Sequence, residues 1–383
     1  MIQSEVLRVV VTGSKGFIGR HLMEALIRRP DVEVRGFDID STRKVLNEAL
    51  READVIFHLA GVNRPERVEE YEAGNHILTK KLCESLEEAD KTPMVVFSSS
   101  VQVELDNPYG KSKLRAEDEL KDWSNRTGAG VTIFRLKNVF GKWCRPNYNS
   151  VVATFCHNIA RGLPISISDP AKKIELVYID DVIATFLDCL NRPPQGCEYR
   201  DVASSFTVSL GELTRQIEMF RDSRHSLLLP DFSDPFLKRL HATYISYLEE
   251  NNFAYQLKIR EDERGELAEF LKQPHFGQIF ISRTKPGITR GNHFHHTKVE
   301  KFLVVEGDAV IRFRRIDGDE IIEYRVSGKD FKVVDIPPGY THNIENVGQG
   351  ELITLFWAGE VFDPKISDTY PLDVVEGEKK GTN

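Results

Sequence analysis

The stretch VVVTGSKGFIG, residues 9–19, joins a run of branched apolar residues to three glycines spaced three apart. A short continuous apolar run is typical of a strand buried on both faces of a sheet, and residues 16–26 then show the spacing of a helix. Gly13, Gly16 and Gly19 would permit a tight turn, close approach of the backbone to a pyrophosphate and close helix packing. Because an ordinary strand-to-helix turn can also explain three glycines, the neighbouring segments must decide.

Strand-like segments recur along the first part of the chain, with helical patterns between most of them: VEVRGFD, DVIFHLAG, PMVVFSSS, VTIFRLKNVFG and LVYIDDV. This alternation predicts an α/β fold, a Rossmann-type doubly wound parallel sheet. Ser209 and Glu212 form a capping box that predicts one more helix. Residues from about Leu228 to Phe253 show no regular pattern, and we place the domain boundary there.

After this boundary the sequence consists of short strand-like segments joined by Gly, Pro and Asp turns, without helical patterns. This pattern predicts an all-β barrel or sandwich. We therefore expect a nucleotide-binding domain at residues 1–245, a β domain at residues 250–372 and a disordered tail at residues 373–383.

Composition narrows the classes of function. The 383 residues are enough for two domains, and the net charge of -8 argues against a nucleic-acid partner. No apolar run approaches a membrane span, and the first strand begins too early to leave room for a signal peptide. The five cysteines are odd in number and form no CxxC pair, so we expect free thiols in the cytoplasm, with Cys83 and Cys156 in the core.

Tyr109 and Lys113, in the segment YGKSK, are four residues apart and would share one face of a helix. A phenol is a poor acid or base at its usual pKa of about 10, and a neighbouring ammonium would lower that pKa. Ser100 ends a strand-like segment, where its hydroxyl could bind a substrate oxygen. A plain surface pair is the alternative for Tyr109 and Lys113, but the glycine turn and the serine favour a reaction site.

As a set, TGSKGFIG, HLAG, FSSS, YGKSK, NVFG and VYIDDV resemble the extended short-chain dehydrogenase/reductase family, specifically its nucleotide-sugar members. The resemblance implies that Tyr109 donates a proton, Lys113 binds the nicotinamide ribose and Ser100 polarises a carbonyl. It implies substrate contacts at Asn138, Asn149 and Ser150. The cofactor-binding residues expected from the turn, the strand ends and the helix are Gly13, Lys15, Gly16, Phe17, Ile18, Gly19, Asp38, Leu59, Ala60, Gly61, Tyr109 and Lys113. The loop between Ser100 and Tyr109 is shorter than the family's usual loop, which would trim the substrate pocket.

The type of nicotinamide cofactor depends on the end of the second strand. Asp38 lies at the distance from Gly19 at which an acidic residue holds a ribose 2′-hydroxyl, which favours NADH. Arg35, Arg43 and Lys15 are near enough in sequence to meet a 2′-phosphate. We expect NADPH, and NADH stays open.

The β domain contains the stretch RGNHFHHTKVEKF, residues 290–302. On a strand, His293 and His295 would point to one face and His296 to the other. Together with Glu300 and the later His342, His293 and His295 could bind Zn²⁺ or another divalent ion. A pair of hydrogen-bonded core histidines without metal is the alternative.

The spacing in GITRGNHFHHTKVEKFLVVEG and PPGYTHNIEN resembles the two motifs of the cupin family. Cupin resemblance implies the ligands His293, His295, Glu300 and His342. Phe331 stands where the second motif usually begins with glycine.

DERGELAEF and TRGNHF also resemble epimerases of 4-keto-6-deoxy nucleotide sugars, in which a histidine at the place of His293 is usually the base and no metal is needed. Glu300 falls where those enzymes carry a lysine that stabilises the enolate. A metal on Glu300 would restore the positive charge. Arg290 and Tyr340 are candidate donors to the substrate. The candidate bases are His296, Asp262 and an unligated His293.

Over nearly the whole chain, HLAGVNRPE, FGKWCRPNYNSVVATFC and KPGITRGNHFHHTKVEKFLVV resemble the CapF-type bifunctional enzymes of capsular and O-antigen polysaccharide synthesis. The resemblance implies C3 epimerisation of a UDP-2-acetamido-2,6-dideoxy-4-hexulose by the cupin. Reduction at C4 to a 6-deoxy-talose sugar would follow, on the route to UDP-N-acetyl-L-fucosamine, in a protein that is homodimeric through the cupin. The alternative is a single-function reductase with the cupin as a dimerisation or sugar-sensing module. A dehydratase is a weaker alternative, because only Glu104 and Asp106 lie near Tyr109 and neither has helical placement.

Overall fold

The computed structural model describes residues 6–375, and the chain forms two compact units. The N-terminal unit is Met1–Glu218 with Arg239–Glu249, and the C-terminal unit is Met219–Lys238 with Glu250–Asn383. Residues 219–238, which we assigned to the first domain, group with the second, where Leu228 bridges to Lys272. Among residues 6–375, no helix combines the length and apolar character needed to cross a membrane.

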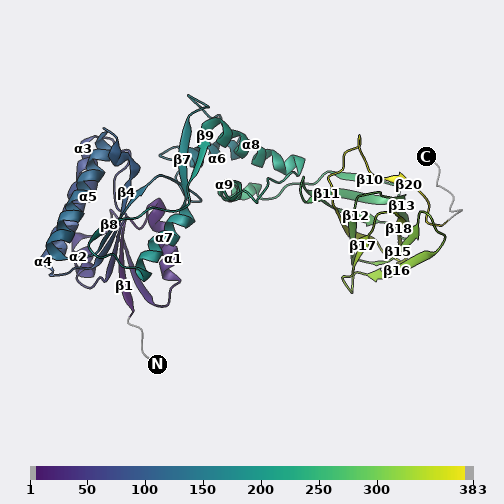
Figure 1. Ribbon diagram of the computed structural model, residues 1–383, viewed down its shortest axis with the longest axis horizontal. Coiled ribbons are helices and arrows are strands. Elements are labelled where there is room, and N and C mark those ends of the chain that lie inside the picture. Colours follow the sequence, from purple (N-terminus) through teal and green to yellow (C-terminus); the bar gives the residue numbers. More distant parts are fainter. Residues whose placement is uncertain (1–5, 376–383) are drawn as a thin grey trace. The chain divides into compact units, whose positions relative to one another are not determined.

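The N-terminal unit is built on a six-stranded sheet in the order β2-β1-β3-β4-β5-β8, in which every neighbouring pair is parallel. Figure 1 shows α1 and α7 on one side of this sheet and α2, α4 and α5 on the other. The strands are β1 (Leu7–Thr12), β2 (Val32–Phe37), β3 (Val55–His58), β4 (Met94–Ser100), β5 (Val131–Leu136) and β8 (Cys197–Tyr199). The order reverses between β1 and β3, which is where such sheets bind ligands. The predicted doubly wound sheet is confirmed.

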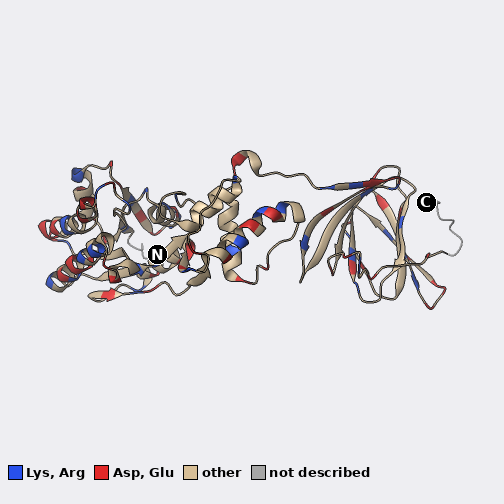
Figure 2. Cartoon of the chain, turned by 90° about the horizontal axis from the view of Figure 1, so that it is seen from above, with Lys and Arg blue, Asp and Glu red and all other residues tan. Residues whose placement is uncertain are grey.

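The helices of this unit are α1 (Phe17–Ile27), α2 (Arg43–Leu50), α3 (Glu69–Tyr71), the π-helix η1 (Glu72–Ile77), α4 (Leu78–Glu88), the 3-10 helix η2 (Val101–Glu104), α5 (Pro108–Thr127), α6 (Val151–Ala160) and α7 (Ile179–Asn191). A small sheet in the order β6-β7-β9 adds β6 (Asn138–Phe140), β7 (Lys173–Tyr178) and β9 (Phe206–Ser209). Figure 2 shows acidic and basic residues interspersed along the outer helices.

Local sequence explains the placement of α5, which carries Tyr109 and Lys113. Asn107 caps its N-terminus by accepting a hydrogen bond from Gly110 N, and Pro108 occupies the first turn. Gly128 ends it in the left-handed conformation, with φ of 73°. Trp123 and Leu120 on its inner face are fully buried in the core beneath the sheet. The helix is thereby fixed against the strand that ends in Ser100.

The C-terminal unit consists of two antiparallel sheets packed around one apolar core, as the sequence predicts. The first, in the order β10-β11-β12-β19-β14-β17, contains β10 (Ile259–Asp262), β11 (Gly265–Gln273), β12 (Gly277–Thr284), β19 (Leu352–Ala358), β14 (Glu300–Glu306) and β17 (Val333–Ile336). The second, in the order β16-β15-β18-β13-β20, contains β16 (Ile321–Ser327), β15 (Asp308–Arg315), β18 (Tyr340–Asn346), β13 (Thr289–Phe294) and β20 (Tyr370–Pro371).

Two segments that we predicted to be irregular or disordered contain ordered structure: residues 228–253 and residues 373–375. The segment 228–253 contains the helix α9 (Pro235–Ile245) and the 3-10 helix η3 (Glu250–Asn252), so the expectation of irregular structure there is wrong. Asp234 caps α9 by accepting a hydrogen bond from Phe236 N, a signal that the aromatic composition of the segment obscured.

The predicted cap of α8 (Leu210–Ser226) is confirmed, because Ser209 Oγ accepts a hydrogen bond from Glu212 N.

The predicted disordered tail, residues 373–383, lies outside the described residues from 376 onward. Before that point the prediction is wrong. Val374 is fully buried, and Arg314 donates hydrogen bonds to the carbonyls of Asp373 and Val374. A buried arginine therefore binds the backbone that the polar sequence suggested was free.

Candidate active sites

The glycine turn lies at the switch point of the parallel sheet. Gly13 has φ of 70°, and a Cβ there would lie 2.7 Å from Ala60 N, so the loop after β3 contacts the turn. A Cβ on Gly19 would lie 2.0 Å from Gly13 O, so only glycine allows this helix entry. Gly16, before α1, has no side chain to cap the helix, and the first-turn N–H groups of Phe17 and Ile18 suit a bound anion.

The segment Leu59–Ala60–Gly61 is thus brought beside the turn, where the sequence places it. Ala60 N donates to Thr12 Oγ1 at 3.3 Å. A Cβ on Gly61 would lie 3.2 Å from Lys113 Nζ, so this glycine leaves room beside the ammonium. These contacts form a cradle of backbone that suits a dinucleotide.

Asp38 also joins this cradle. Its carboxylate accepts from Lys15 N at 2.8 Å and from Ile39 N at 2.9 Å. The Lys15 ammonium is paired with Asp40, and Arg35 pairs with Glu33. Two of the candidate 2′-phosphate cations, Lys15 and Arg35, thus have acidic partners, while the Asp38 carboxylate is bound to the turn.

Ser100, Tyr109 and Lys113 meet at the carboxyl end of β4. Burial raises the pKa of the Tyr109 phenol, and the hydrogen bond with Ser100 lowers it in part. The expected lowering of this pKa by Lys113 is not found, because burial outweighs the hydrogen bond with Ser100 and Lys113 does not contribute to the shift. Lys113 Nζ donates to Ser98 O at 2.9 Å and lies 4.7 Å from the centre of the Phe97 ring.

The Lys113 ammonium is buried, and burial lowers its pKa to about 8 although Glu117 opposes this shift. Glu117 is fully buried and accepts three hydrogen bonds from Arg135, the shortest at 2.7 Å. Ser99 and Tyr199 also donate to its carboxylate. The positive charge of Lys113 is therefore matched by a fixed carboxylate one helical turn away.

Asn75 is a buried residue of this site that our sequence reasoning missed. It lies in the π-helix η1, where its amide donates to Val62 O and Ser112 Oγ, each at 3.0 Å, and accepts from Val62 N. It ties the loop after β3 to α5 between Tyr109 and Lys113. A π-helix marks functional sites often, but no single-sequence pattern predicts one.

The predicted substrate contacts have structural partners of their own. Asn138 is exposed and donates to Glu175 O at 3.1 Å, which joins β6 to β7. Ser150 caps α6 by accepting from Ala153 N, while Asn149 is exposed beside it. Asn149 therefore keeps an open position in its loop, whereas Ser150 has a structural task.

In the C-terminal unit, four side chains converge inside the barrel: His293, His295, Glu300 and His342. Their candidate ligand atoms all lie within 4.8 Å of one another. Glu300 Oε2 lies 3.5 Å from His295 Nε2 and 3.7 Å from His342 Nε2. The ring of His296 points elsewhere, against Phe294 and Tyr370, as the alternation along the strand predicts.

The chemistry of this cluster fits a divalent cation. His295 Nε2 and His342 Nε2 are buried without a hydrogen-bond partner among the described residues. Burial lowers the pKa of His293 to about 3, so its ring is neutral and can coordinate. Burial would raise the pKa of Glu300, but the two histidines and Lys298 bring it well below its usual range. Three imidazoles and a carboxylate are a ligand set suited to Zn²⁺.

The cluster lies at a cavity of about 430 Å³ that His293 and Glu300 line together with Arg264, Arg290 and Lys298. The candidate donor Arg290 is therefore at the cavity. Within the part of the chain that the structure describes, Tyr340, His296 and Asp262 are not part of its lining. Tyr340 packs against the core, and Asp262 is bound by Arg264 at 2.9 Å.

The N-terminal part of the chain, residues 9–203, matches the NAD dependent epimerase/dehydratase family, and residues 260–370 match the polysaccharide biosynthesis C-terminal domain. CapF from Staphylococcus aureus, a capsular polysaccharide assembling protein, superposes with a TM-score of 0.89 at 45% identity over 95% of this chain and 99% of its own. The chain belongs to the CapF family.

A relative from Pseudomonas aeruginosa is a UDP-2-acetamido-2,6-beta-L-arabino-hexul-4-ose reductase. It is 44% identical over 97% of this chain and 100% of its own length. A UDP-glucuronic acid 4-epimerase from Bacillus cereus, solved with NAD, has a TM-score of 0.52 at 20% identity and covers 56% of this chain and 83% of its own. That likeness shows the fold alone.

Lys298 is a cavity residue of this CapF-family chain that our sequence reasoning missed. Its ammonium lies 3.2 Å from Glu300 Oε1 and 3.1 Å from Thr369 Oγ1. A lysine two positions before Glu300 thus brings its positive charge to that carboxylate. The signal was present in HHTKVE, where the histidines dominate the pattern.

Proposed function

We propose that this chain is a bifunctional nucleotide-sugar enzyme. The C-terminal unit would epimerise C3 of a UDP-2-acetamido-2,6-dideoxy-4-hexulose, and the N-terminal unit would reduce its C4 ketone to a UDP-N-acetyl-6-deoxy-talosamine type product for capsule or O-antigen synthesis. The observation that carries the proposal is the presence on one chain of two separate sites, Ser100–Tyr109–Lys113 and the His/Glu cavity. The full-length similarity to a UDP-sugar reductase supports the substrate class.

For reduction, the residues of the N-terminal unit position a ketone and supply its proton. NADPH, when bound, supplies the hydride to C4. Ser100 donates a hydrogen bond to the C4 oxygen, and Tyr109 transfers its phenolic proton to that oxygen as the C–H bond forms. Lys113 holds the cofactor's ribose, and its charge stabilises the phenolate left on Tyr109. The N–H groups at the start of α1 bind the pyrophosphate of the dinucleotide.

For epimerisation, His293, His295, Glu300 and His342 would hold Zn²⁺. The ion supplies a Lewis acid that stabilises negative charge on a substrate oxygen. Arg290 and Lys298 line the same cavity and add positive charge to it. Of the three candidate bases, His293 is the one that lines the cavity. It can accept the C3 proton only as an unligated ring, in which case His295, Glu300 and His342 would hold the ion.

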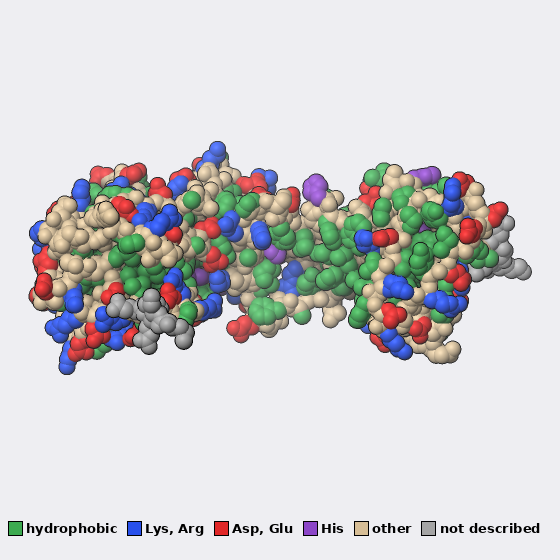
Figure 3. Space-filling model, turned by 60° about the horizontal axis from the view of Figure 1, so that its bottom comes forward, with side chains coloured by type: hydrophobic (Ala, Val, Ile, Leu, Met, Phe, Trp, Pro, Cys, Tyr) green, Lys and Arg blue, Asp and Glu red, His purple; other side chains and the backbone are tan. Residues whose placement is uncertain are grey.

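We also propose that two chains associate through the cupin. The face of the first sheet that points away from the cavity carries an apolar patch, with Leu355 flanked by Ile281 and Leu303 on the neighbouring strands, beside the ion pair of Lys301 and Asp335. Trp357 and Val333 extend this face, and Figure 3 shows hydrophobic side chains at the surface of this unit. The wild-type mass from light scattering should be that of a dimer, and Leu355→Lys should give monomers; a monomeric wild type would contradict the proposal.

The reaction is tested with the full chain. In D2O without nicotinamide, the enzyme should exchange the C3 hydrogen of the UDP-4-keto-6-deoxy sugar for deuterium, as read by proton NMR. Addition of NADPH should then give the C4-reduced product. Reduction without any C3 exchange would instead identify a single-function reductase whose cupin serves dimerisation or sensing.

A further inference from the structure

The chain after β19 returns to the histidine cluster. Residues 368–374, here called the C-terminal strap, run beside β13, where Tyr370 pairs with Phe294 and Pro371 with His293. Leu372 N donates to Asn292 O at 3.0 Å, and Thr341 Oγ1 donates to Leu372 O. The strap therefore touches the backbone beside His293 and the residue before His342. Neither the chemistry of reduction nor the ligand set accounts for these contacts.

Asp368 is the strap residue that holds the turn connecting His295 to Glu300. Its carboxylate accepts hydrogen bonds from His296 N at 2.9 Å and from three donors on Thr297 and Lys298: Thr297 N at 2.7 Å, Thr297 Oγ1 at 2.9 Å and Lys298 N at 2.9 Å. All of these donors belong to that turn. One carboxylate thus fixes the path of the chain between two candidate ligands.

The backbone of Asp368 acts on His295 itself. Its carbonyl oxygen lies 2.6 Å from His295 Nδ1, which must carry the proton to donate to it. The proton on Nδ1 leaves the lone pair on Nε2, the nitrogen that faces Glu300 and lacks a hydrogen-bond partner among the described residues. Histidines that bind metals are oriented by such a partner on the other ring nitrogen, and loss of the partner costs roughly 10–100-fold in metal affinity.

The strap also holds a residue in an unfavourable conformation. Asn292, next to His293, has φ of 58° at a bulge in β13. Its side-chain oxygen accepts from Asn343 Nδ2 at 2.9 Å and from Val374 N at 3.3 Å. A positive φ outside glycine persists where surrounding contacts impose it, and here they come partly from the strap.

From these contacts we infer that Asp368 is a positioning residue for the metal site of the cupin. It orients His295 through its carbonyl and the turn 296–298 through its carboxylate, and thereby sets the affinity for Zn²⁺. The inference rests on the metal site of the proposed function. It assigns a role in that site to a segment that carries no ligand.

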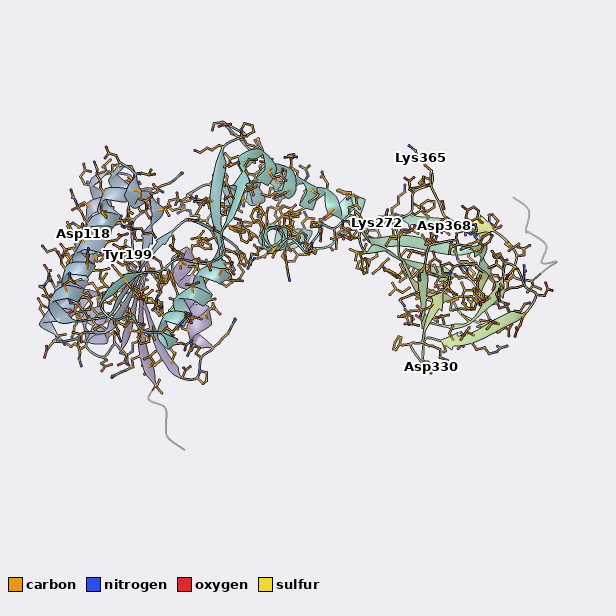
Figure 4. All side chains as sticks on the ribbon, viewed as in Figure 1. Asp118, Tyr199, Lys272, Asp330, Lys365 and Asp368 are labelled. Atoms are coloured by element: carbon orange, nitrogen blue, oxygen red, sulfur yellow. The ribbon has the colours of Figure 1, made fainter. Side chains whose placement is uncertain are left out.

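The test compares Asp368→Ala and Asp368→Asn with Asp330→Asn in the full-length protein. Asp330 is an exposed aspartate on another turn of the same unit, so it controls for the loss of one negative charge (Figure 4). Zn²⁺ affinity is measured by competition with a chromophoric chelator, and the visible spectrum of the Co²⁺-loaded protein reports the coordination geometry. NADPH oxidation with the epimerised ketone shows that the N-terminal unit is folded.

Asp368→Ala keeps the backbone carbonyl but removes the carboxylate that ties the strap to the turn 296–298, so that carbonyl is no longer held against His295. We therefore expect Zn²⁺ binding to weaken by about 10–100-fold and the Co²⁺ spectrum to change. Asp368→Asn keeps one acceptor oxygen but places an NH2 against a backbone donor, so its loss should be smaller. Asp330→Asn should match the wild type. Wild-type Zn²⁺ affinity in Asp368→Asn and Asp368→Ala would overturn the inference, and Asp368→Asn alone decides if the alanine variant fails to fold. A wild type that binds no metal would overturn the metal site itself.

Discussion

In the N-terminal unit, the reaction groups come from a strand end and a helix that the sequence motifs mark, whereas in the C-terminal unit the ligands come from β13, the turn after it, β14 and β18, and they depend on strand register. The glycine turn joins one strand to the helix that follows it, and Tyr109 and Lys113 lie four residues apart on the single helix α5. The cluster around His342 exists only because β18 pairs with β13 so that His342 faces His293. In a site made of local motifs, a substitution should remove the role of one residue. In a site that depends on strand register, a shift of register should displace all the ligands together.

The two sites should therefore be separable by mutation, and the largest effect is expected at Tyr109. Tyr109→Phe removes the proton donor, and the loss of a general acid lowers kcat roughly 10²–10⁴-fold. NADPH binding, measured by fluorescence, and C3 exchange in D2O should persist. Tyr71→Phe, whose ring lies 5.8 Å from that of Tyr109, is the matched control. Wild-type reduction by Tyr109→Phe would remove this residue from the mechanism.

The second test addresses the cupin. Glu300→Ala and His342→Ala should each lose Zn²⁺ from a wild-type content of about one per chain, because the remaining ligands leave an incomplete site. C3 exchange should disappear while reduction of an already epimerised ketone continues. Glu306→Ala, an exposed glutamate on the same strand, is the control. Unchanged metal content by elemental analysis would favour core histidines without metal.

A third test uses pH and concerns the N-terminal unit alone. Burial lowers the pKa of Lys113 to about 8, so its ammonium is present below that pH and is lost as the pH rises through it. The kcat/KM for reduction should fall on the alkaline side near pH 8. Because Glu117 raises the pKa of Lys113, Glu117→Gln should move this fall to lower pH. The control Glu119→Gln should leave the alkaline limb at its wild-type position. If the limb also stays in place in Glu117→Gln, Lys113 is not its cause.

Cofactor preference should respond more weakly. The Asp38 carboxylate lies beside the glycine turn, where it would bind a ribose 2′-hydroxyl and repel a 2′-phosphate. Asp38→Asn should shift the ratio of kcat/KM for NADPH over NADH upward by about tenfold, the value of one charge-assisted hydrogen bond. Asp31→Asn is the control, because Asp31 pairs with Arg29, which is not one of the candidate 2′-phosphate cations. If the wild type prefers NADH, Asp38 sets the cofactor preference and our prediction of NADPH is wrong.

The smallest effect is expected at Phe331. It has φ of 44° at the place where cupin motifs usually have glycine, and its side chain is exposed. Glycine would relieve the left-handed conformation, so Phe331→Gly should raise the free energy of unfolding of the C-terminal unit by about 1 kcal/mol. Urea denaturation checks this, and a destabilised variant would mean that the ring contributes to packing.

Both folds could be predicted from the sequence because hydrophobic periodicity and turn residues are local properties. The four-residue cluster was predictable because cupin spacing encodes the register of two strands. Lys298, Asn75 and Asp368 were not predictable. Lys298 acts through a side chain that contacts Glu300 two residues later, Asn75 depends on a π-helix, and Asp368 lies 73 residues from His295 in a segment without a recognisable motif.

The interleaving of the two units limits how this chain can be divided. The polypeptide passes from the N-terminal unit to residues 219–238, returns with residues 239–249 and leaves again. A single cut near residue 247 would separate β11 from Leu228, whose neighbours exchange backbone hydrogen bonds with Lys272. A cut before residue 219 would instead take Tyr247, which donates to Cys144 O, away from the first unit. A single cut by a protease, or a gene rearrangement with one breakpoint, would therefore leave each unit without one of the segments that form it.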